Sequence, residues 1–233
     1  MVVQPIRPLS LYASYSTSFN PVLGASFDGA AFEPERGVQY EAGVKLELLG
    51  GKITSTLAVY ELTRENVLTP DPANPGFNVQ EGEQRSRGVE VDVAGEVLPG
   101  LRLIGTYAYT DAEITKSTAG NEGNRPANVP RHTGTLWGVY EFRDGFLKGL
   151  GLGAGVIAVG RRPADNDNTA NLPDYVRTDA AIYYKITRHV DLAVNFRNIF
   201  DVRYYETSTF GDPFGGISPG APFSVFGSIT ARY

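Results

Sequence analysis

Apolar and polar residues alternate with a period of two along the last part of the chain, from Asp191 to Tyr233. In the first half of this segment Leu192, Val194 and Phe196 take every second position, against Asp191, Ala193, Asn195 and Arg197. The second half sets Phe223, Val225, Ile229 and Tyr233 against Ser224, Ser228, Thr230 and Arg232. Because successive side chains of a strand point to opposite faces, the pattern predicts two strands with one apolar face each.

The same strand-like pattern recurs along the whole chain, punctuated by turn residues. It predicts about ten strands, and no segment has a convincing helical period. The predicted strands are Leu9–Phe19, Val38–Leu48, Ile53–Val67, Arg87–Val97, Leu101–Ile114, His132–Phe142, Leu150–Arg161, Tyr175–Ile186, Val190–Tyr205 and Phe223–Tyr233.

The connections between these strands alternate in length. Short turns are expected at 49–51, 98–100, 143–145 and 188–189, and long loops at 20–37, 68–86, 115–131, 162–174 and 206–222. Such alternation is typical of a transmembrane barrel with tight periplasmic turns and long extracellular loops. The chain is therefore predicted to be all-β, with the antiparallel strands of an up-and-down transmembrane β-barrel.

Charged residues distinguish the two faces of several strands. Val89, Val91 and Val93 alternate with Glu90 and Asp92. Later in the chain Val176, Ala180, Ile182 and Tyr184 alternate with Arg177, Asp179 and Lys185. The charged face is predicted to line the lumen of the barrel. For Ile53–Val67 both faces are fairly apolar, and the pattern does not choose between them.

Tyrosines gather towards the predicted strand ends, as in an interfacial aromatic girdle: Tyr40, Tyr107, Tyr109, Tyr140, Tyr204, Tyr205 and Tyr233. From periodicity alone, a soluble all-β protein whose tyrosines pack a core is the alternative.

Composition narrows the function classes. The 233 residues are 42% hydrophobic and 20% charged, with a net charge of −5. No run approaches the roughly 18 apolar residues that a transmembrane helix needs, because Leu150–Gly160 is short and broken by glycines. The negative charge argues against a nucleic-acid binder. There is no cysteine, so no disulfide or thiolate site is possible.

Candidate catalytic groups are few. His132 and His189 have no partner at ligand spacing, and no nucleophile elbow occurs. The glycines at 151, 153 and 155 indicate close-packed strand positions rather than a nucleotide loop. The acidic loop 165–169 lacks the sixth-position glycine and closing glutamate of an EF-hand, so at most a loose surface Ca²⁺ site is plausible. Glu90 and Asp92 are interpreted as part of a lumen charge network with Arg85, Arg87 and Arg102. We expect no enzyme activity, no cofactor and no resident metal.

Several ordered motifs resemble one family. Residues 198–205, Asn-Ile-Phe-Asp-Val-Arg-Tyr-Tyr, resemble a sequence near the end of TonB-dependent outer-membrane receptors, which is followed by one loop and a last strand ending in an aromatic. Residues 34–45, Pro-Glu-Arg-Gly-Val-Gln-Tyr-Glu-Ala-Gly-Val-Lys, resemble the head of a barrel strand in that family. Segments 87–92, 107–112 and 129–132 match in order between them. Tyr233 stands where the family usually has Phe.

The resemblance implies a siderophore (ferrichrome-like) receptor. On this basis residues 1–233 are the C-terminal portion of a barrel of about 22 strands, without its signal peptide and N-terminal plug domain. The implied function is ferric siderophore uptake across the outer membrane of a Gram-negative-type bacterium, energised by TonB through the plug. Outer-membrane lipid and the barrel-assembly machinery are the other implied partners, with Tyr233 as assembly signal. A self-contained small barrel, acting as a passive pore or structural protein, is the alternative.

The long loops mix aromatic and cationic residues with Gly, Pro and Asn. Such side chains at a barrel mouth suit an anionic or hydroxamate iron chelate with apolar edges. The residues predicted to bind ligand are Phe77, Arg161, Arg162, Phe210 and Phe214.

Overall fold

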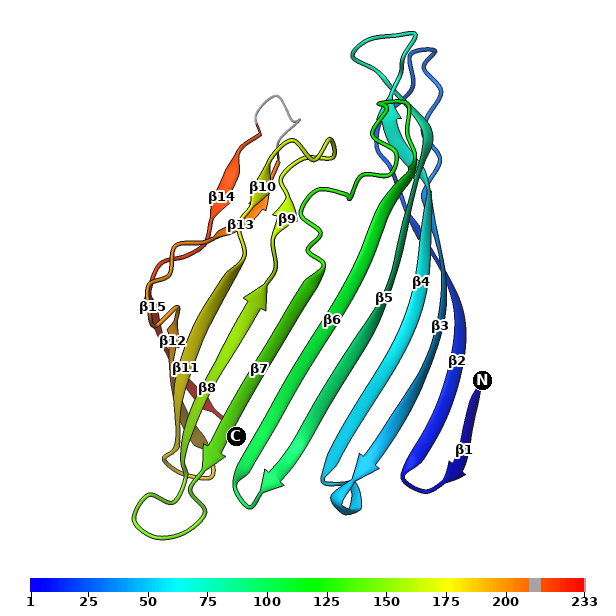
Figure 1. The fold of residues 1–233 in the computed structure, drawn as a ribbon. Helices are drawn as coiled ribbons and strands as arrows, with labels where there is room; N and C mark the ends of the chain where they lie inside the picture. Colours follow the sequence, from blue (N-terminus) through cyan, green and yellow to red (C-terminus); the bar gives the residue numbers. More distant parts are fainter. Residues whose placement is uncertain (210–214, 233) are drawn as a thin grey trace.

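The computed structural model describes residues 1–209 and 215–232 as one curved, tilted wall of antiparallel strands with loops rising from one end (Figure 1). The main sheet has eleven strands in the order β1-β2-β3-β4-β5-β6-β7-β8-β11-β12-β15. These are β1 Val2–Ile6, β2 Leu9–Asn20, β3 Glu35–Leu48, β4 Ile53–Pro70, β5 Asn78–Leu98, β6 Leu101–Lys116, β7 His132–Glu141, β8 Leu150–Val159, β11 Tyr175–Lys185, β12 Val190–Arg197 and β15 Ser224–Ala231.

Two small hairpins lie outside the main sheet, at the loop end of the wall (Figure 1). One pairs β9 (Arg162–Pro163) with β10 (Asn171–Leu172), and the other pairs β13 (Tyr205–Ser208) with β14 (Ile217–Pro219). A 3₁₀ turn, η1 (Leu49–Gly51), connects β3 to β4. Among the residues described, no helix is long and apolar enough to cross a membrane.

Cross-strand register shows which residues of neighbouring strands share the polar or the apolar face of the wall. Leu57 on β4 lies opposite Val91 on β5, and Val91 lies opposite Tyr107 on β6. One position along, Thr56 lies opposite Asp92. Since paired residues share a face, the choice that the sequence left open for β4 is settled: Leu57 lies on the apolar face and Thr56 on the polar face. The alternations predicted for β5, β11 and β12 are confirmed, as is that predicted for the last strand within β15.

The apolar face ends in a charged row towards the loop end. Glu61, Arg87 and Asp111 lie opposite one another on β4, β5 and β6, and the Arg87 guanidinium is 3.0 Å from the Asp111 carboxylate. In the next row Arg85 pairs with Glu113 at 2.9 Å. Charge on the lipid face of a barrel costs about 2–4 kcal/mol at the midplane and little at the interfaces. This row therefore marks one boundary of the apolar band.

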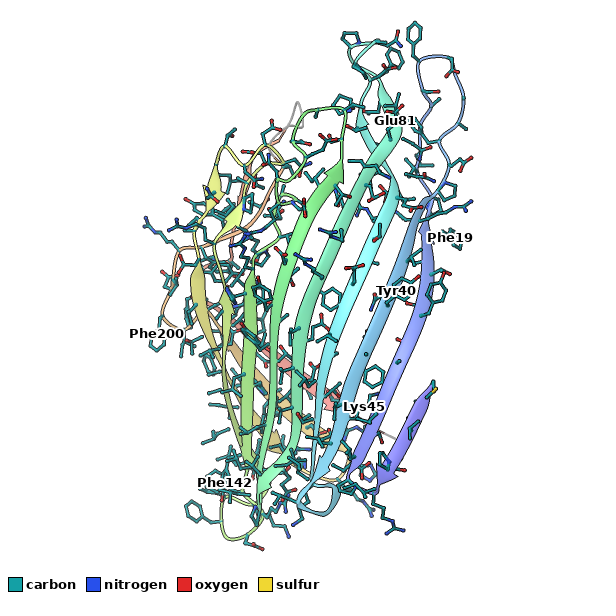
Figure 2. The ribbon with its side chains drawn as sticks, turned by 45° about the vertical axis from the view of Figure 1, so that its right-hand side comes forward. Phe19, Tyr40, Lys45, Glu81, Phe142 and Phe200 are labelled. Atoms are coloured by element: carbon teal, nitrogen blue, oxygen red, sulfur yellow. The ribbon has the colours of Figure 1, made fainter. Side chains whose placement is uncertain are left out.

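Close packing explains the glycines of β8. Trp137 of β7 lies against this strand, and a Cβ at Gly155 would be 2.5 Å from the Trp137 ring. Gly153 has the same neighbour, with 2.8 Å between a built Cβ and the indole. The predicted close-packed strand positions are confirmed. Figure 2 shows the side chains of the wall, with Phe142 at the turn end and Glu81 at the loop end.

The structure corrects several predicted elements. β1 was not predicted. The loop predicted at 68–86 is mostly strand, because β4 and β5 continue to Pro70 and from Asn78 through register shifts. The turn predicted at 143–145 extends over 142–149. The strand predicted over Val190–Tyr205 ends at Arg197, where the chain leaves the wall.

Candidate functional site

The turn after β12 is built on a buried asparagine. Asn198 is 0% exposed and has a φ of 54°, a left-handed conformation that asparagine tolerates. Its Oδ1 accepts a hydrogen bond from the Val202 N–H at 2.9 Å, and its Nδ2 donates to the carbonyls of Val202 (2.9 Å) and Ala221 (3.1 Å). One side chain thus closes the turn and ties it to the segment that precedes β15.

A second polar contact completes this turn. Asp201, with a φ of 49°, accepts a hydrogen bond from the Phe223 N–H at 2.9 Å. The Asn198 N–H donates to Asp179 on β11 at 2.8 Å. The Asn-Ile-Phe-Asp segment therefore has a structural role, because it joins β11, β12 and the start of β15 at the loop end.

Beyond the turn, Tyr204 enters a stack of aromatic and cationic groups. Its ring lies 4.5 Å from that of Tyr175, centroid to centroid. Arg162 lies over the Tyr175 ring and Arg177 over the Tyr204 ring, each at 5.8 Å. A side chain at Gly220 would overlap the Tyr204 ring, so glycine allows this close approach. Tyr204 is buried here, so its predicted place in an interfacial girdle is wrong.

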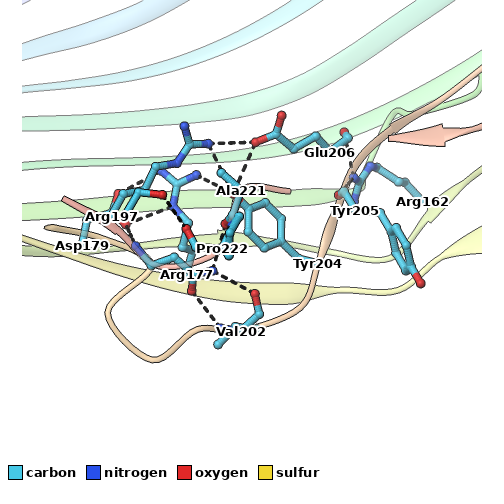
Figure 3. Close-up of polar contacts among 12 residues, drawn as sticks. Arg162, Arg177, Asp179, Arg197, Val202, Tyr204, Tyr205, Glu206, Ala221 and Pro222 are labelled. Atoms are coloured by element: carbon cyan, nitrogen blue, oxygen red, sulfur yellow. Dashed lines mark hydrogen bonds and ion pairs between the residues drawn. The ribbon is translucent and has the colours of Figure 1, made fainter. Parts of the chain in front are cut away.

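Ion pairs and hydrogen bonds link this stack to the polar face of the wall (Figure 3). We call Arg162, Arg177, Asp179, Arg197, Tyr204 and Glu206 the arginine cluster. Arg177 binds Asp179 through two nitrogens, at 3.1 and 2.9 Å, and Arg197 binds Glu206 at 2.8 Å. The Tyr204 hydroxyl accepts from Arg177 (3.1 Å) and Arg197 (3.3 Å) and donates to Glu206 (3.3 Å).

Arg162 lies at the rim end of the cluster and is only 3% exposed. Its Nη2 donates to the backbone carbonyls of Tyr205 (2.7 Å) and Glu206 (3.0 Å). Its Nη1 is buried without a hydrogen-bond partner, as is Nε of Arg197. Arg162 thus holds the Tyr205–Glu206 backbone against the β9–β10 hairpin, and most of its surface is closed to a ligand.

Side-chain amides join the loops above the cluster. Asn128 and Ser208 are bonded twice at 2.7 Å, because the Asn128 amide donates to the Ser208 carbonyl and accepts from its N–H. Asn168 likewise accepts from the Arg125 N–H (3.2 Å) and donates to the Arg125 carbonyl (2.8 Å). The segments 117–131, 160–174 and 202–209, which we call the clasped loops, are therefore connected by side-chain hydrogen bonds across separations of up to 80 residues.

The acidic loop belongs to these clasped loops. The Asp165 carboxylate accepts from the Thr169 N–H (2.9 Å), the Thr169 hydroxyl (2.8 Å) and the Ala170 N–H (3.1 Å). Desolvation raises the pKa of Asp165, but these hydrogen bonds outweigh it and hold that pKa below its usual range. Among residues 1–209 and 215–232, no group of three or more His, Asp or Glu side chains is placed to hold a metal ion.

A second set of loops lies at the loop end of the wall, apart from the clasped loops. The Gln80 side chain accepts from the Glu33 N–H (2.7 Å) and donates to the Glu33 carbonyl (2.6 Å). Above this contact Phe27 and Phe77 meet edge to face at 5.1 Å. Both rings are exposed, Phe77 by 42%. We call residues 21–34 and 71–77 the aromatic tip.

Among the residues that the structure describes, those predicted to bind ligand are not brought together. Phe77 lies exposed in the aromatic tip, whereas Arg161 is exposed and Arg162 buried among the clasped loops. Phe210, Phe214 and Tyr233 lie outside the described residues. Arg85 and Arg87 pair with Glu113 and Asp111 on the apolar side, so their predicted network with Glu90 and Asp92 is wrong.

Sequence reasoning missed most of the arginine cluster. Arg177 and Arg197 were predicted to face inward, but nothing near them in sequence indicates that Tyr204 and Glu206 join them. If the predicted strand had continued through Tyr205, the side chains of Tyr204 and Glu206 would have moved away from Arg177 and Arg197. Asn198 and Asp201, which tolerate a left-handed φ, were the sequence signal for a turn at this point.

Comparison with known proteins gives a consistent result. The family model for the β-barrel of TonB-dependent receptor-like proteins matches residues 1–199. The chain is 44% identical to the metal-pseudopaline receptor CntO of Pseudomonas aeruginosa (strain UCBPP-PA14) over 234 aligned positions, which cover 100% of this chain and 33% of the relative. It is 39% identical to the ferrichrome outer membrane transporter/phage receptor of Escherichia coli K12, covering 95% of this chain and 30% of the relative.

Solved structures show the same similarity. The siderophore receptor PiuA from Acinetobacter baumannii superposes with a TM-score of 0.82 at 26% identity, over 100% of this chain and 35% of that one. The chain thus spans about a third of the length of the curated relatives that it matches.

Proposed function

Because the chain belongs to the TonB-dependent receptor family, within its β-barrel, we propose that it forms part of the wall of an outer-membrane receptor that takes up ferric siderophores with energy delivered through TonB. The observation that carries this proposal is the division of one long sheet into an apolar and a polar face, with long, cross-linked loops at the end opposite the short turns. A wall of this kind separates lipid from a polar lumen, and its loops can meet a ligand outside the cell.

The two faces suggest different partners. The apolar face exposes large side chains such as Leu57, Val59 and Ile182, which suit outer-membrane lipid. The polar face carries ion pairs at the turn end, including Lys185 with Glu141 at 2.6 Å. Such a surface suits contact with a polar folded domain, so we assign it to the plug through which TonB would act. Insertion would fall to the barrel-assembly machinery.

A self-contained small barrel acting as a passive pore is not favoured. Among the described residues β1 pairs only with β2, and β15 only with β12, so the eleven strands do not close on themselves. An open edge leaves unpaired backbone groups that lipid does not tolerate. The relatives found are receptors and transporters by name.

The ligand is proposed to enter between the clasped loops and the aromatic tip. There Phe77 and Arg161 offer exposed aromatic and cationic surface. Ferric hydroxamate and catecholate chelates are the probes, and quenching of intrinsic fluorescence in the complete protein is the measurement. We expect saturable binding of at least one chelate. Absence of saturable binding for every chelate would contradict the siderophore assignment and leave the barrel intact.

A matched pair of variants locates the binding end. Phe77→Ala should weaken chelate binding several-fold, since truncating an aromatic contact commonly costs more than about 1 kcal/mol. Phe146, exposed in the turn at 142–149, provides the control at the opposite end, and Phe146→Ala should bind like wild type. Equal weakening by both substitutions would argue against a ligand site at the loop end.

A further inference from the structure

The arginine cluster lacks one negative charge. Arg162, Arg177 and Arg197 contribute three positive charges, and Asp179 and Glu206 contribute two negative ones. The carboxylates pair with Arg177 and Arg197, and no ion pair involves Arg162 among the described residues. The Arg162 charge is buried against backbone carbonyls and one aromatic ring, with Nη1 unpartnered. Buried charges are usually compensated by a charge of opposite sign, and Arg162 has no such counter-charge among the described residues.

Part of the cluster is open to a ligand from the polar face. The Arg197 side chain is 37% exposed and that of Glu206 is 47% exposed. Nη2 of Arg197 is used by Glu206 and Tyr204, whereas no hydrogen bond joins Nη1 to any described residue. In Figure 3 this guanidinium projects from the wall beside Glu206. An incoming group could therefore reach Arg197 without disturbing the buried Arg162.

The group already bound there indicates what chemistry fits. Glu206 places a carboxylate oxygen against the Arg197 guanidinium and the Tyr204 hydroxyl, at 2.8 and 3.3 Å. Guanidinium groups bind planar carboxylates through paired N–H donors. A second carboxylate at Nη1 of Arg197, which bonds no described residue, would supply the missing charge. One that displaces Glu206 would use the same donors as Glu206 does.

We propose that the arginine cluster is a recognition site for one carboxylate of the bound metal chelate, with Arg197 as the contact residue. This inference rests on the proposed function and narrows its substrate class to chelates that carry a free carboxylate. Arg162 binds the Glu206 backbone next to the contact and contributes its uncompensated charge, while the Tyr204 hydroxyl accepts a hydrogen bond from the Arg197 guanidinium.

The test uses two ferric tris-hydroxamate chelates that differ only in one carboxylate, free in the first and methylated in the second. Binding to the complete protein is measured by fluorescence quenching. Arg197→Gln should weaken the free-carboxylate chelate at least about tenfold, because hydrogen bonds between charged groups are strong. The methyl ester should change by less than about twofold in the same variant.

Glu206→Gln gives a prediction of opposite sign. Removing the resident carboxylate should strengthen binding of the free-carboxylate chelate several-fold and leave the ester unchanged. If the cluster only supports the fold, this substitution should weaken both chelates or neither. Glu206→Gln therefore keeps the proposal testable even if Arg197→Gln does not fold. Arg188→Gln, in the exposed turn before β12 at the far end, is the matched control and should bind both chelates like wild type.

Two results overturn the carboxylate site while leaving the receptor function standing. One is equal weakening of both chelates by Arg197→Gln, and the other is no effect of either cluster substitution on a chelate that wild type binds. If wild type binds neither of these two probes nor any other ferric chelate, the proposed function fails, and the inference fails with it.

Discussion

The wall and the loops above it are held together by different kinds of interaction. In the wall, the backbone ladder joins neighbouring strands, and most side chains are constrained mainly by the face on which they lie. Above it, single side chains connect segments far apart in sequence, as Asn128 does with Ser208. The effect of a substitution in the wall should therefore depend mainly on the face that the residue occupies. The effect of a substitution in the loops should depend on the hydrogen bonds that the side chain makes.

Substituting Asn198, at the junction between the wall and the loops, should cause the largest loss of stability. Asn198→Ala removes three hydrogen bonds, orphans backbone groups of Val202 and Ala221, and leaves alanine in a left-handed conformation. Each buried polar group left unpaired costs about 1–3 kcal/mol, so we expect a loss of roughly 3–4 kcal/mol in unfolding free energy. Urea unfolding of the complete protein in lipid vesicles is the measurement.

Asn195 offers a matched control three residues earlier on the polar face of β12. Its side chain makes no hydrogen bond to any described residue, so Asn195→Ala should cost less than about 1 kcal/mol. Similar losses for the two variants would show that the turn does not anchor the loops.

Within the clasped loops the expected effect is smaller and local. Asn128→Gly removes both bonds to Ser208, and glycine accepts the φ of 64° at this position. Hydrogen exchange at the Ser208 amide should accelerate about tenfold or more, corresponding to roughly 1.4 kcal/mol, while amides of β12 keep their protection. Unchanged exchange at Ser208 would mean that the loops are not clasped in solution.

Lowering the pH should destabilise the loop that contains Asp165 before it destabilises the wall. The folded-state pKa of Asp165 is lowered, so its contribution to stability is present above the unfolded pKa of about 4 and is lost as pH falls through the folded value. Below about pH 4, exchange at Thr169 and Ala170 should rise beyond its intrinsic pH dependence. The same profile in Asp165→Asn would exclude this carboxylate as the cause.

The wall could be predicted from the sequence because its information is local. A period of two indicates each strand, and a single charged residue such as Asp92 identifies the polar face. The predicted ends of β4 and β5 are wrong because polar residues suggested a loop there. In the structure both strands continue past those residues, because they keep pairing with each other.

The arginine cluster could not be predicted in the same way. Arg162 meets Tyr205 and Glu206 across more than 40 residues, and Arg177 meets Tyr204 only because the chain turns at Asn198. Periodicity carries no information about such contacts. The loop composition predicted a ligand-binding end, which stays a prediction, and it did not show which of its arginines is buried and which is exposed.

The central proposal is that this sheet is a membrane wall, with its apolar face towards lipid and its polar face towards a lumen. Val91→Arg and Asp92→Asn, neighbours on opposite faces of β5, test it most directly in a folding titration of the complete protein in lipid vesicles. Val91→Arg should cost about 2–4 kcal/mol and Asp92→Asn little. Equal costs for the two substitutions would contradict the assignment of the faces, and with it the account of this chain as a barrel wall.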